Sequence, residues 1–287
     1  MILVTGASGH VGGAVARLLT ESGDPLRLMV RDAAKAPVIA GAEIAEADYA
    51  DPASLGRAMN GVRTALVVSG SEREGKRALL HRNVFEAAAR AGIGHLVYLS
   101  FQGASASSKF AASRDHHLSE GYLRETGIPA TVLRDNFYLD LIPELAGADG
   151  LIRGPAGDGR VAWVARDDVA AVAAAVLRDP ARYPGVYELT GPEALSLAET
   201  THRLSSLPGR KLGYHDESLE EGRAWRLAQG APEWLVDGWL GSYLAIAAGE
   251  LEPVSDVIER ILGRPPQGLE AYFARHPELL AGPGEAG

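Results

Sequence analysis

The feature that most constrains the fold is the stretch 2–31, in which two apolar runs flank a glycine-rich turn and a helical pattern. Residues 2–4 form a short apolar run that is typical of a buried strand. Three glycines follow at positions 6, 9 and 12, and apolar residues then recur at helical spacing. A second apolar run at 26–30 predicts another strand. The stretch therefore predicts a strand, a tight turn, a helix and a parallel strand, which is the repeating unit of α/β sheets.

Each glycine of the turn has a physical reason of its own. Gly6 lets the chain turn sharply off the first strand, Gly9 lets the backbone approach a pyrophosphate, and Gly12 lets the helix pack closely on the sheet. The free N–H groups and the positive dipole end of the helix face the same anion. A loop that only turns the chain is the alternative, and the flanking strands and helix argue against it. The residues predicted to hold a dinucleotide here are Gly6, Ser8, Gly9, His10, Val11 and Gly12.

The residues after the second strand bear on which dinucleotide is bound. An acidic side chain at this place would accept hydrogen bonds from the adenosine ribose of NAD. This chain has Arg31 instead, with Lys35 nearby. The forked donors of an arginine can hold a 2′-phosphate, so we favour NADP (NADPH) over NAD. The alternative is that Arg31 is a solvated surface residue and that Asp32 binds the ribose.

Composition excludes several classes of protein. The chain has no cysteine, so it has no disulfide framework, thiolate zinc site or cysteine nucleophile. A net charge of −9 without a basic stripe argues against a nucleic-acid partner, and no apolar run is long enough to span a bilayer. The first strand begins almost at Met1 and leaves no room for a signal peptide. We expect a cytoplasmic protein with a small-molecule substrate and no metal, nucleic-acid or membrane partner, and homodimer formation stays open.

Strand and helix patterns alternate along the first half of the chain. Further apolar runs at 41–45, 65–68, 95–99 and 130–133 predict strands, with helices between them. This alternation predicts an α/β fold with a doubly wound parallel Rossmann sheet and right-handed crossovers.

The second half of the chain changes character. The glycine-rich stretch 149–160 predicts a long loop, and 161–164 predicts a short strand. An alanine-rich helix and a last strand follow, and short helices take up the rest of the chain. We predict an NAD(P)-binding Rossmann domain at 1–190, whose loop 136–160 contributes to the substrate cleft, and a smaller, mostly helical substrate lobe at 191–287.

Small and polar residues follow the predicted strands at their carboxyl ends, where doubly wound sheets bind ligands. Ser69 and Gly70 come after the fourth strand and are expected to pass under the riboses of the cofactor. Ser100 and Gln102 come after the fifth strand and are expected to face the nicotinamide or the substrate. The polar loop 104–109 behind them predicts a mobile cover over the site.

The spacing Gly-x-x-Gly-x-x-Gly behind Thr5 resembles that of the extended and atypical short-chain dehydrogenase/reductase superfamily. The resemblance implies NAD or NADP bound across the carboxyl ends of a parallel sheet. Asp48 falls where this superfamily often places an aspartate near the adenine amino group, and an ordinary loop aspartate explains it equally well. Typical members use a Tyr-x-x-x-Lys pair, but no tyrosine here has a lysine four residues later. The missing pair argues against an ordinary carbonyl reductase or epimerase.

The predicted helix 114–126, where that lysine would be expected, carries His116 and Glu120 on one face. His116 could donate a proton to a substrate oxygen or orient it, with Glu120 holding the other ring nitrogen. The alternative is a surface pair on an amphipathic helix. His81, on an earlier predicted helix, is more typical of packing or capping than of catalysis.

The segments 94–104, 116–123, 126–138 and 157–170 are similar to the NmrA-like atypical short-chain family. Within this family they resemble the group of type 2 NADPH:quinone oxidoreductase and triphenylmethane reductase, and the resemblance implies a histidine and a glutamate of that group at the positions of His116 and Glu120. Asn136 and Phe137 are expected on the nicotinamide side of the cofactor. The triplet Leu-Arg-Asp before them departs from the family's usual Leu-Arg-Pro or Leu-Arg-Asn.

The resemblance implies hydride transfer to a quinone or another conjugated acceptor, which needs little acid catalysis and therefore fits the missing Tyr–Lys pair. His116, Glu120, Ser100 and Gln102 are the candidate catalytic residues. A different class is a non-catalytic NADP(H) sensor that binds a protein partner, since the family contains such regulators. A third reading is a biosynthetic reductase of an aromatic or imine substrate. The His116–Glu120 pair and the polar loop favour an enzyme over a sensor.

Overall fold

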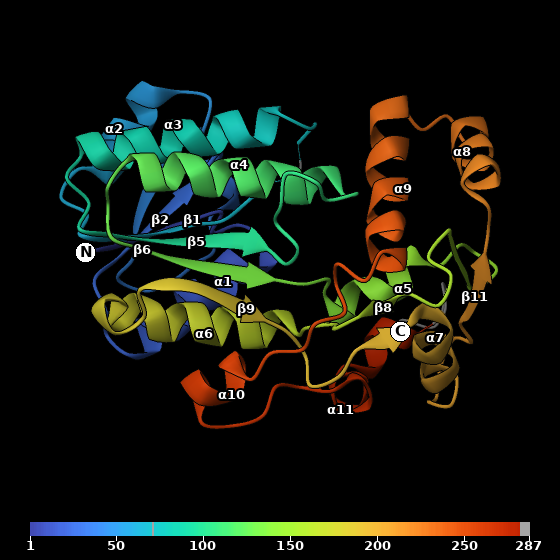
Figure 1. Ribbon diagram of the computed structural model, residues 1–287. Helices are drawn as coiled ribbons and strands as arrows, with labels where there is room; N and C mark the ends of the chain where they lie inside the picture. The colour runs from blue at the N-terminus through green and yellow to red at the C-terminus, as the bar shows by residue number, and fades with distance from the viewer. Residues whose placement is uncertain (71, 282–287) are drawn as a thin grey trace. The chain divides into compact units, whose positions relative to one another are not determined.

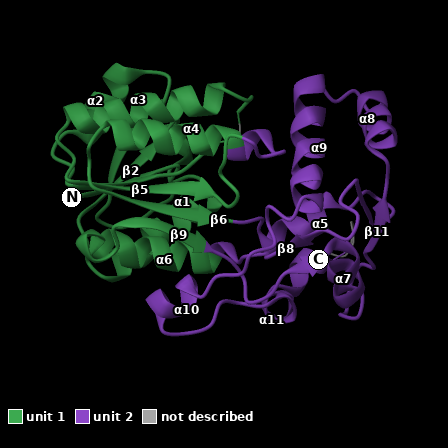
Figure 2. Ribbon diagram, in the orientation of Figure 1, with its two compact units in different colours: residues 1–106, 114–135, 167–188 green, residues 107–113, 136–166, 189–287 purple. Residues whose placement is uncertain are grey.

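The structure is a computed structural model that describes residues 1–70 and 72–281. Its chain divides into two compact units, each assembled from separate stretches of sequence (Figure 2). Unit 1 consists of Met1–Ala106, Arg114–Asp135 and Asp167–Glu188. Unit 2 consists of Ser107–Ser113, Asn136–Arg166 and Leu189–Gly287, of which the last six residues lie outside the described part.

Unit 1 is built around a seven-stranded sheet with the strand order β3-β2-β1-β4-β5-β6-β9. The strands are β1 (Ile2–Thr5), β2 (Leu26–Val30), β3 (Glu43–Glu46), β4 (Thr64–Val67), β5 (His95–Phe101), β6 (Ala130–Asp135) and β9 (Gly185–Leu189). The pairs from β3 through β6 are parallel. The strand order reverses between β1 and β4, and this is the position at which doubly wound sheets bind ligands.

Helices cover both faces of this sheet. They are α1 (His10–Glu21), α2 (Pro52–Met59), α3 (Lys76–Arg90), α4 (Ala111–Glu125) and α6 (Arg166–Arg178). Figure 1 shows α2, α3 and α4 on one face and α1 and α6 on the other. All four residues of β1 and of β4 are buried for this reason, and their sequences are continuous apolar runs apart from a threonine in each. The predicted doubly wound Rossmann fold is confirmed.

Unit 2 contains two small sheets and short helices. Strand β7 (Leu151–Gly154) pairs in parallel with β11 (Gly213–Asp216), and β8 (Arg160–Val161) pairs antiparallel with β10 (Leu195–Ser196). The helices are α5 (Ile142–Leu145), α7 (Leu197–Leu204), α8 (Leu219–Ala228), α9 (Glu233–Ala247), α10 (Val257–Leu262) and α11 (Leu269–Arg275). No helix in the described ranges 1–70 and 72–281 has both the length and the apolar character needed to cross a membrane.

Two local predictions for the second half were wrong. The stretch 149–160 is not one long loop, because it contains β7. Its glycines serve close packing as well as turning: a Cβ on Gly154 would lie 2.4 Å from a ring carbon of Tyr243. Of the strand expected at 161–164, only Val161 belongs to a paired strand, which is β8. Val164 forms an isolated bridge to Tyr138.

Candidate functional site

The turn between β1 and α1 is held by its glycines. Gly6 adopts a positive φ of 60°, and its carbonyl accepts a hydrogen bond from the Gly9 N–H at 2.9 Å. A Cβ on Gly12 would lie 2.4 Å from the Gly6 oxygen, so any larger residue would push α1 away from the turn. The turning role predicted for Gly6 and the packing role predicted for Gly12 are therefore confirmed.

The first turn of α1 presents backbone donors without a competing cap. Its N-cap residue is Gly9, which provides no side-chain hydrogen bond, and the first turn contains no acidic residue. The N–H groups of His10, Val11 and Gly12 are the ones that a helix leaves without an internal acceptor. Ser8 beside them is exposed. Uncapped donors, a positive dipole end and an open approach fit the pyrophosphate of a dinucleotide.

A partly buried hydroxyl pair joins the ends of β1 and β4 at the point where the strand order reverses. Thr5 Oγ1 accepts from the Val68 N–H at 2.9 Å, and the Tyr49 hydroxyl donates to the Val68 carbonyl at 2.9 Å. The two hydroxyls are 2.5 Å apart, so Thr5 donates to Tyr49. Burial raises the pKa of Tyr49, so it stays a neutral phenol. No sequence pattern marked Tyr49 as a residue of the site.

The carboxyl ends of β2 and β3 are neighbours and bring the residues expected near the adenosine to one edge. Arg31 follows β2 directly, is exposed and forms no ion pair with a described residue. Asp32 caps a short helix by accepting from the Ala34 N–H at 3.0 Å, and it lies 3.8 Å from Lys35. Asp48 follows β3, and its carboxylate accepts from the Ala50 N–H at 2.7 Å in a local turn.

Arg77 from α3 fixes the loop after β4, which contains the predicted residues Ser69 and Gly70. Its guanidinium donates to the Gly70 carbonyl at 3.0 Å and to Asp115 of α4 at 3.1 Å. Asp115 also accepts from the Gly75 N–H at 2.7 Å. Burial raises the pKa of Asp115, and the Gly75 hydrogen bond and the Arg77 charge oppose that rise.

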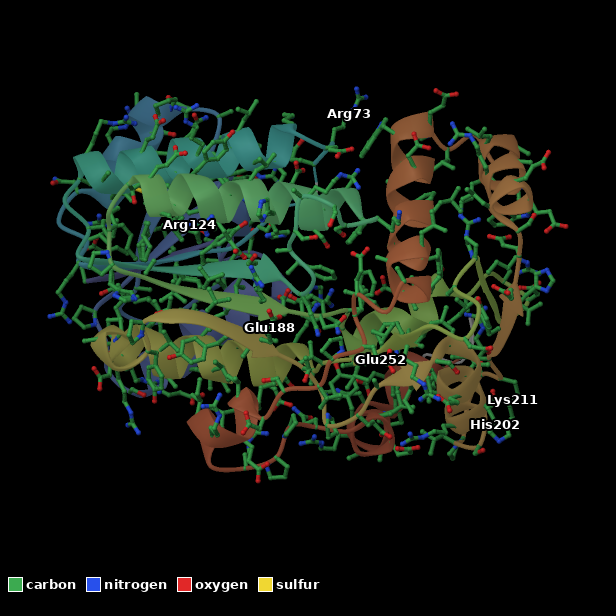
Figure 3. The ribbon with its side chains drawn as sticks, in the orientation of Figure 1. Arg73, Arg124, Glu188, His202, Lys211 and Glu252 are labelled. Atoms are coloured by element: carbon green, nitrogen blue, oxygen red, sulfur yellow. The ribbon has the colours of Figure 1, made fainter. Side chains whose placement is uncertain are left out.

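The carboxyl ends of β5 and β6 carry a side-chain cluster around Glu120, which is 2% exposed. Ser100 donates to this carboxylate at 2.7 Å, and Arg134 forms two hydrogen bonds with it at 2.7 and 2.8 Å. Arg134 also donates to Glu188, labelled in Figure 3 at the end of β9, at 3.0 Å. The second oxygen of Glu188 is buried, and no residue of the described ranges forms a hydrogen bond with it. Arg134 and Glu188 were not identified from the sequence.

The expected pairing of His116 with Glu120 was wrong, because Ser100 and Arg134 occupy the Glu120 carboxylate. The alternative of a surface pair was wrong too, since His116 is only 5% exposed. Gln102, another candidate, is buried, and its backbone N–H donates to the Asp135 carbonyl at 2.7 Å.

His116 belongs to a buried polar layer between β5, α3 and α4. Its Nδ1 lies 2.7 Å from the Tyr98 hydroxyl, which lies 3.0 Å from Nδ1 of His81. Burial, followed by the charge of Arg77, lowers the pKa of His81 to about 3. Burial, the competition with His81 for a proton, and the charges of Arg77 and Arg134 hold the pKa of His116 well below its usual range. Both imidazoles are therefore neutral at physiological pH, and His81 has the packed environment that was expected.

The two residues expected on the nicotinamide side belong to unit 2, whereas the other candidate residues belong to unit 1. The Asn136 amide donates to the Leu251 carbonyl at 3.0 Å and accepts from the Phe137 N–H at 2.7 Å. The Phe137 ring lies 5.9 Å from Phe110 and 6.1 Å from Trp163, measured between centroids. Their contact with a cofactor stays a prediction.

Comparison with known proteins identifies the class. Residues 6–180, more than half of the chain, match the family model described as NAD(P)H-binding. The chain therefore belongs to this NAD(P)H-binding family. Its fold and the uncapped turn of α1 agree with that assignment.

Individual relatives show which NAD(P)H-binding proteins this chain is similar to. Quinone oxidoreductase 2 of Escherichia coli (strain K12) is 34% identical over 272 residues, which span 92% of this chain and 94% of that protein. The structure of the Escherichia coli NADPH-dependent quinone oxidoreductase QOR2 complexed with NADPH has a TM-score of 0.87 at 33% identity, covering 97% of this chain and 100% of the other. Triphenylmethane reductase of Citrobacter sp., complexed with NADP(H), has a TM-score of 0.85 at 30% identity, covering 96% and 99%. These relatives are oxidoreductases, and they confirm the predicted resemblance, enzyme class and NAD(P)H cofactor.

Proposed function

We propose that this protein is a cytoplasmic, NADPH-dependent oxidoreductase that transfers hydride to a quinone-like or other conjugated, aromatic small molecule. The observation that carries the proposal is the β1–α1 turn, whose uncapped backbone donors stand at the reversal of strand order in the sheet. The missing Tyr-x-x-x-Lys pair supports an acceptor that takes hydride directly. The relatives named above act on compounds of this kind.

The preference for NADPH over NADH rests on Arg31. Its guanidinium is exposed directly behind β2 and has no carboxylate partner among residues 1–70 and 72–281. A planar guanidinium without a partner suits bidentate binding of a 2′-phosphate. The ammonium of Lys35, which lies 3.8 Å from a carboxylate oxygen of Asp32, adds a second positive charge nearby.

When bound, NADPH supplies the hydride, and reduction of a quinone to a hydroquinone then needs one proton from solvent. The task of the protein is to position the two reactants and to exclude competing water. Arg134, held by two carboxylates, and Ser100, held by Glu120, give the ends of β5 and β6 a fixed geometry. His116 is the candidate group for the oxygen of the acceptor, because it is a buried, uncharged side chain behind this edge.

The main alternative is a non-catalytic NADP(H) sensor that binds a protein partner. Both proteins would bind NADPH, so cofactor binding does not distinguish them. The named relatives are oxidoreductases, and the side-chain cluster at the ends of β5 and β6 would offer fixed polar groups to an acceptor bound there.

The test is NADPH oxidation, followed by absorbance, with a panel of quinones, cationic dyes and imines. Binding of NADPH and NADH is measured by fluorescence on the same preparation. Turnover with a quinone or dye, and tighter binding of NADPH than of NADH, support the proposal. Tight NADPH binding without turnover of any acceptor contradicts it and favours the sensor. Light scattering on the same sample determines whether the protein is a homodimer.

A further inference from the structure

The buried layer that contains His116 consists of polar side chains that form hydrogen bonds with one another. Tyr98 of β5 is fully buried and contacts a histidine from α3 and another from α4. His81 in turn lies 2.9 Å from the Ser119 hydroxyl of α4. These four side chains form one continuous hydrogen-bonded chain inside unit 1. It extends from Ser119 through His81 and Tyr98 to His116.

The donors and acceptors in this hydrogen-bonded series can be assigned, because each hydroxyl has only one proton to donate. Ser119 donates its proton to the Asp115 carbonyl at 2.8 Å, so its oxygen accepts from His81. His81 must therefore carry its proton on Nδ1, and it shares that proton with the Tyr98 oxygen. Tyr98 is left to donate to Nδ1 of His116 at 2.7 Å. Nδ1 of His116 is then an acceptor, and the single proton of this neutral ring sits on Nε2.

The reverse direction is unfavourable. It would require Ser119 and Tyr98 both to donate to Nδ1 of His81, which has a single lone pair. The forward direction needs only one N–H shared between two oxygen acceptors, and three-centre bonds of that type are common in proteins. The 2.7 Å distance from Tyr98 to His116 also suits an O–H donor.

The charges around His116 agree with a neutral ring. Besides burial, the charges of Arg77 from α3 and Arg134 from β6 disfavour an imidazolium at this position. The nearby carboxylates do not compensate, because Asp115 is paired with Arg77, and Glu120 is paired with Arg134.

We propose that Tyr98 and His81 are positioning residues that hold His116 as the neutral Nε2–H tautomer, so that His116 offers a permanent hydrogen-bond donor to an oxygen of the bound acceptor. This inference rests on the proposed function. Nε2 has no hydrogen-bond partner among residues 1–70 and 72–281, and it is not one of their fully buried unpaired atoms, so it keeps a small exposed area within a side chain that is 5% exposed. Such a donor stabilises the charge that an acceptor oxygen gains as hydride arrives. His116 keeps its proton throughout.

The first test is the protonation state of His116 in the full-length protein, measured by NMR with ¹⁵N-labelled histidine and NADPH added. The His116→Gln variant assigns the signals. We expect an unprotonated Nδ1 and a protonated Nε2 at His116, unchanged between about pH 8 and pH 5 because the ring does not titrate there. A proton on Nδ1, or a titration within that range, would overturn the proposal.

The second test is the Tyr98→Phe variant, which removes one oxygen and lets His116 exchange tautomers. We expect kcat with a quinone to fall roughly tenfold, as for loss of one hydrogen bond, with little change in the Kd for NADPH. The His116→Ala variant should lose roughly 100-fold in kcat, as for removal of a donor to a developing oxyanion. The matched control is Tyr122→Phe on α4, whose hydroxyl has no hydrogen-bond partner among residues 1–70 and 72–281.

The two tests separate the inference from the proposed function. A wild-type protein that reduces no acceptor refutes the proposed function, and with it the role of His116 toward an acceptor, whereas the tautomer measured by NMR still stands. Normal turnover in Tyr98→Phe together with an Nδ1-protonated His116 refutes the inference alone. If Tyr98→Phe does not fold, the NMR measurement on the wild-type protein decides the tautomer.

Discussion

In unit 1, the turn between β1 and α1 and the cluster at the ends of β5 and β6 consist of different chemical groups. At β1 and α1 the site consists of backbone N–H groups, and the sequence supplies glycines that let the backbone turn and pack. At β5 and β6 the site consists of side chains, among which Glu120 and Arg134 hold one another. The geometry of a site made of backbone groups depends on the backbone conformation, whereas the geometry of a site made of side chains depends on which side chains pair. The two sides should therefore respond to mutation in different ways.

Breaking the side-chain pairing should cost the most stability. The Glu120→Gln variant leaves Arg134 without its buried carboxylate, and we expect a loss of about 3 kcal/mol in the free energy of unfolding. The matched variant Glu188→Gln removes the more exposed partner of the same arginine and should cost about 1 kcal/mol or less. Urea unfolding measures both. Equal losses would show that Glu120 does not dominate the cluster.

A side chain placed at Gly9 in the turn between β1 and α1 should abolish cofactor binding without a comparable loss in the free energy of unfolding. A Cβ on Gly9 would lie 3.3 Å from the Gly6 oxygen, and a valine there also obstructs the first N–H groups of α1. We expect Gly9→Val to weaken NADPH binding by more than about 100-fold. Gly56→Val, on an exposed face of α2 with nothing within 4 Å, is the control. Retained binding in Gly9→Val would mean that this turn does not hold the phosphates.

The edge formed by β2 and β3 should decide between the two cofactors. We expect Arg31→Ala to weaken NADPH binding by roughly 10- to 100-fold, the effect of one charge-assisted contact, and to leave NADH binding nearly unchanged. Arg57→Ala, an exposed change on α2, should alter neither Kd. Equal weakening of both cofactors in Arg31→Ala would remove the argument for the 2′-phosphate.

The buried histidines should make unit 1 sensitive to acid. The pKa of His81 falls from 6.5 to about 3 on folding, so between these values the unfolded chain binds the extra proton. Stability is therefore lost as the pH falls below about 6.5, by about 1.4 kcal/mol per pH unit for this group. His81→Asn keeps an N–H donor near Nδ1 but does not titrate. Its unfolding free energy should depend less steeply on pH between about 6 and 4, and an unchanged slope would contradict the assignment.

The comparison of the two sides also explains what the sequence predicted well. Strands such as β1 are apolar except for one threonine, and the glycine spacing is local, so the fold and the turn followed from neighbouring residues. The element β7 was missed because Gly150 and Gly154 looked like loop residues. In the structure, Gly154 is small because Tyr243 packs against it.

The side-chain cluster was only partly predictable. Ser100 and Glu120 were both identified, but their contact joins β5 to α4 across 20 positions and has no local signal. Tyr98 was missed because it lies within an apolar run. A usable signal was present, since Tyr98 and Ser100 share one face of β5, and His116 and Glu120 share the buried face of α4. Polar residues on faces that should be apolar predict a buried network.

The most direct test of the account is anaerobic reduction of a simple quinone by the wild-type protein, with NADPH and quinone followed in the same cuvette. We predict that one NADPH is oxidised for each quinone reduced, that NADH is a poorer donor, and that Gly9→Val abolishes the reaction. A protein that binds NADPH tightly and oxidises it with none of the quinones, dyes or imines would contradict the account.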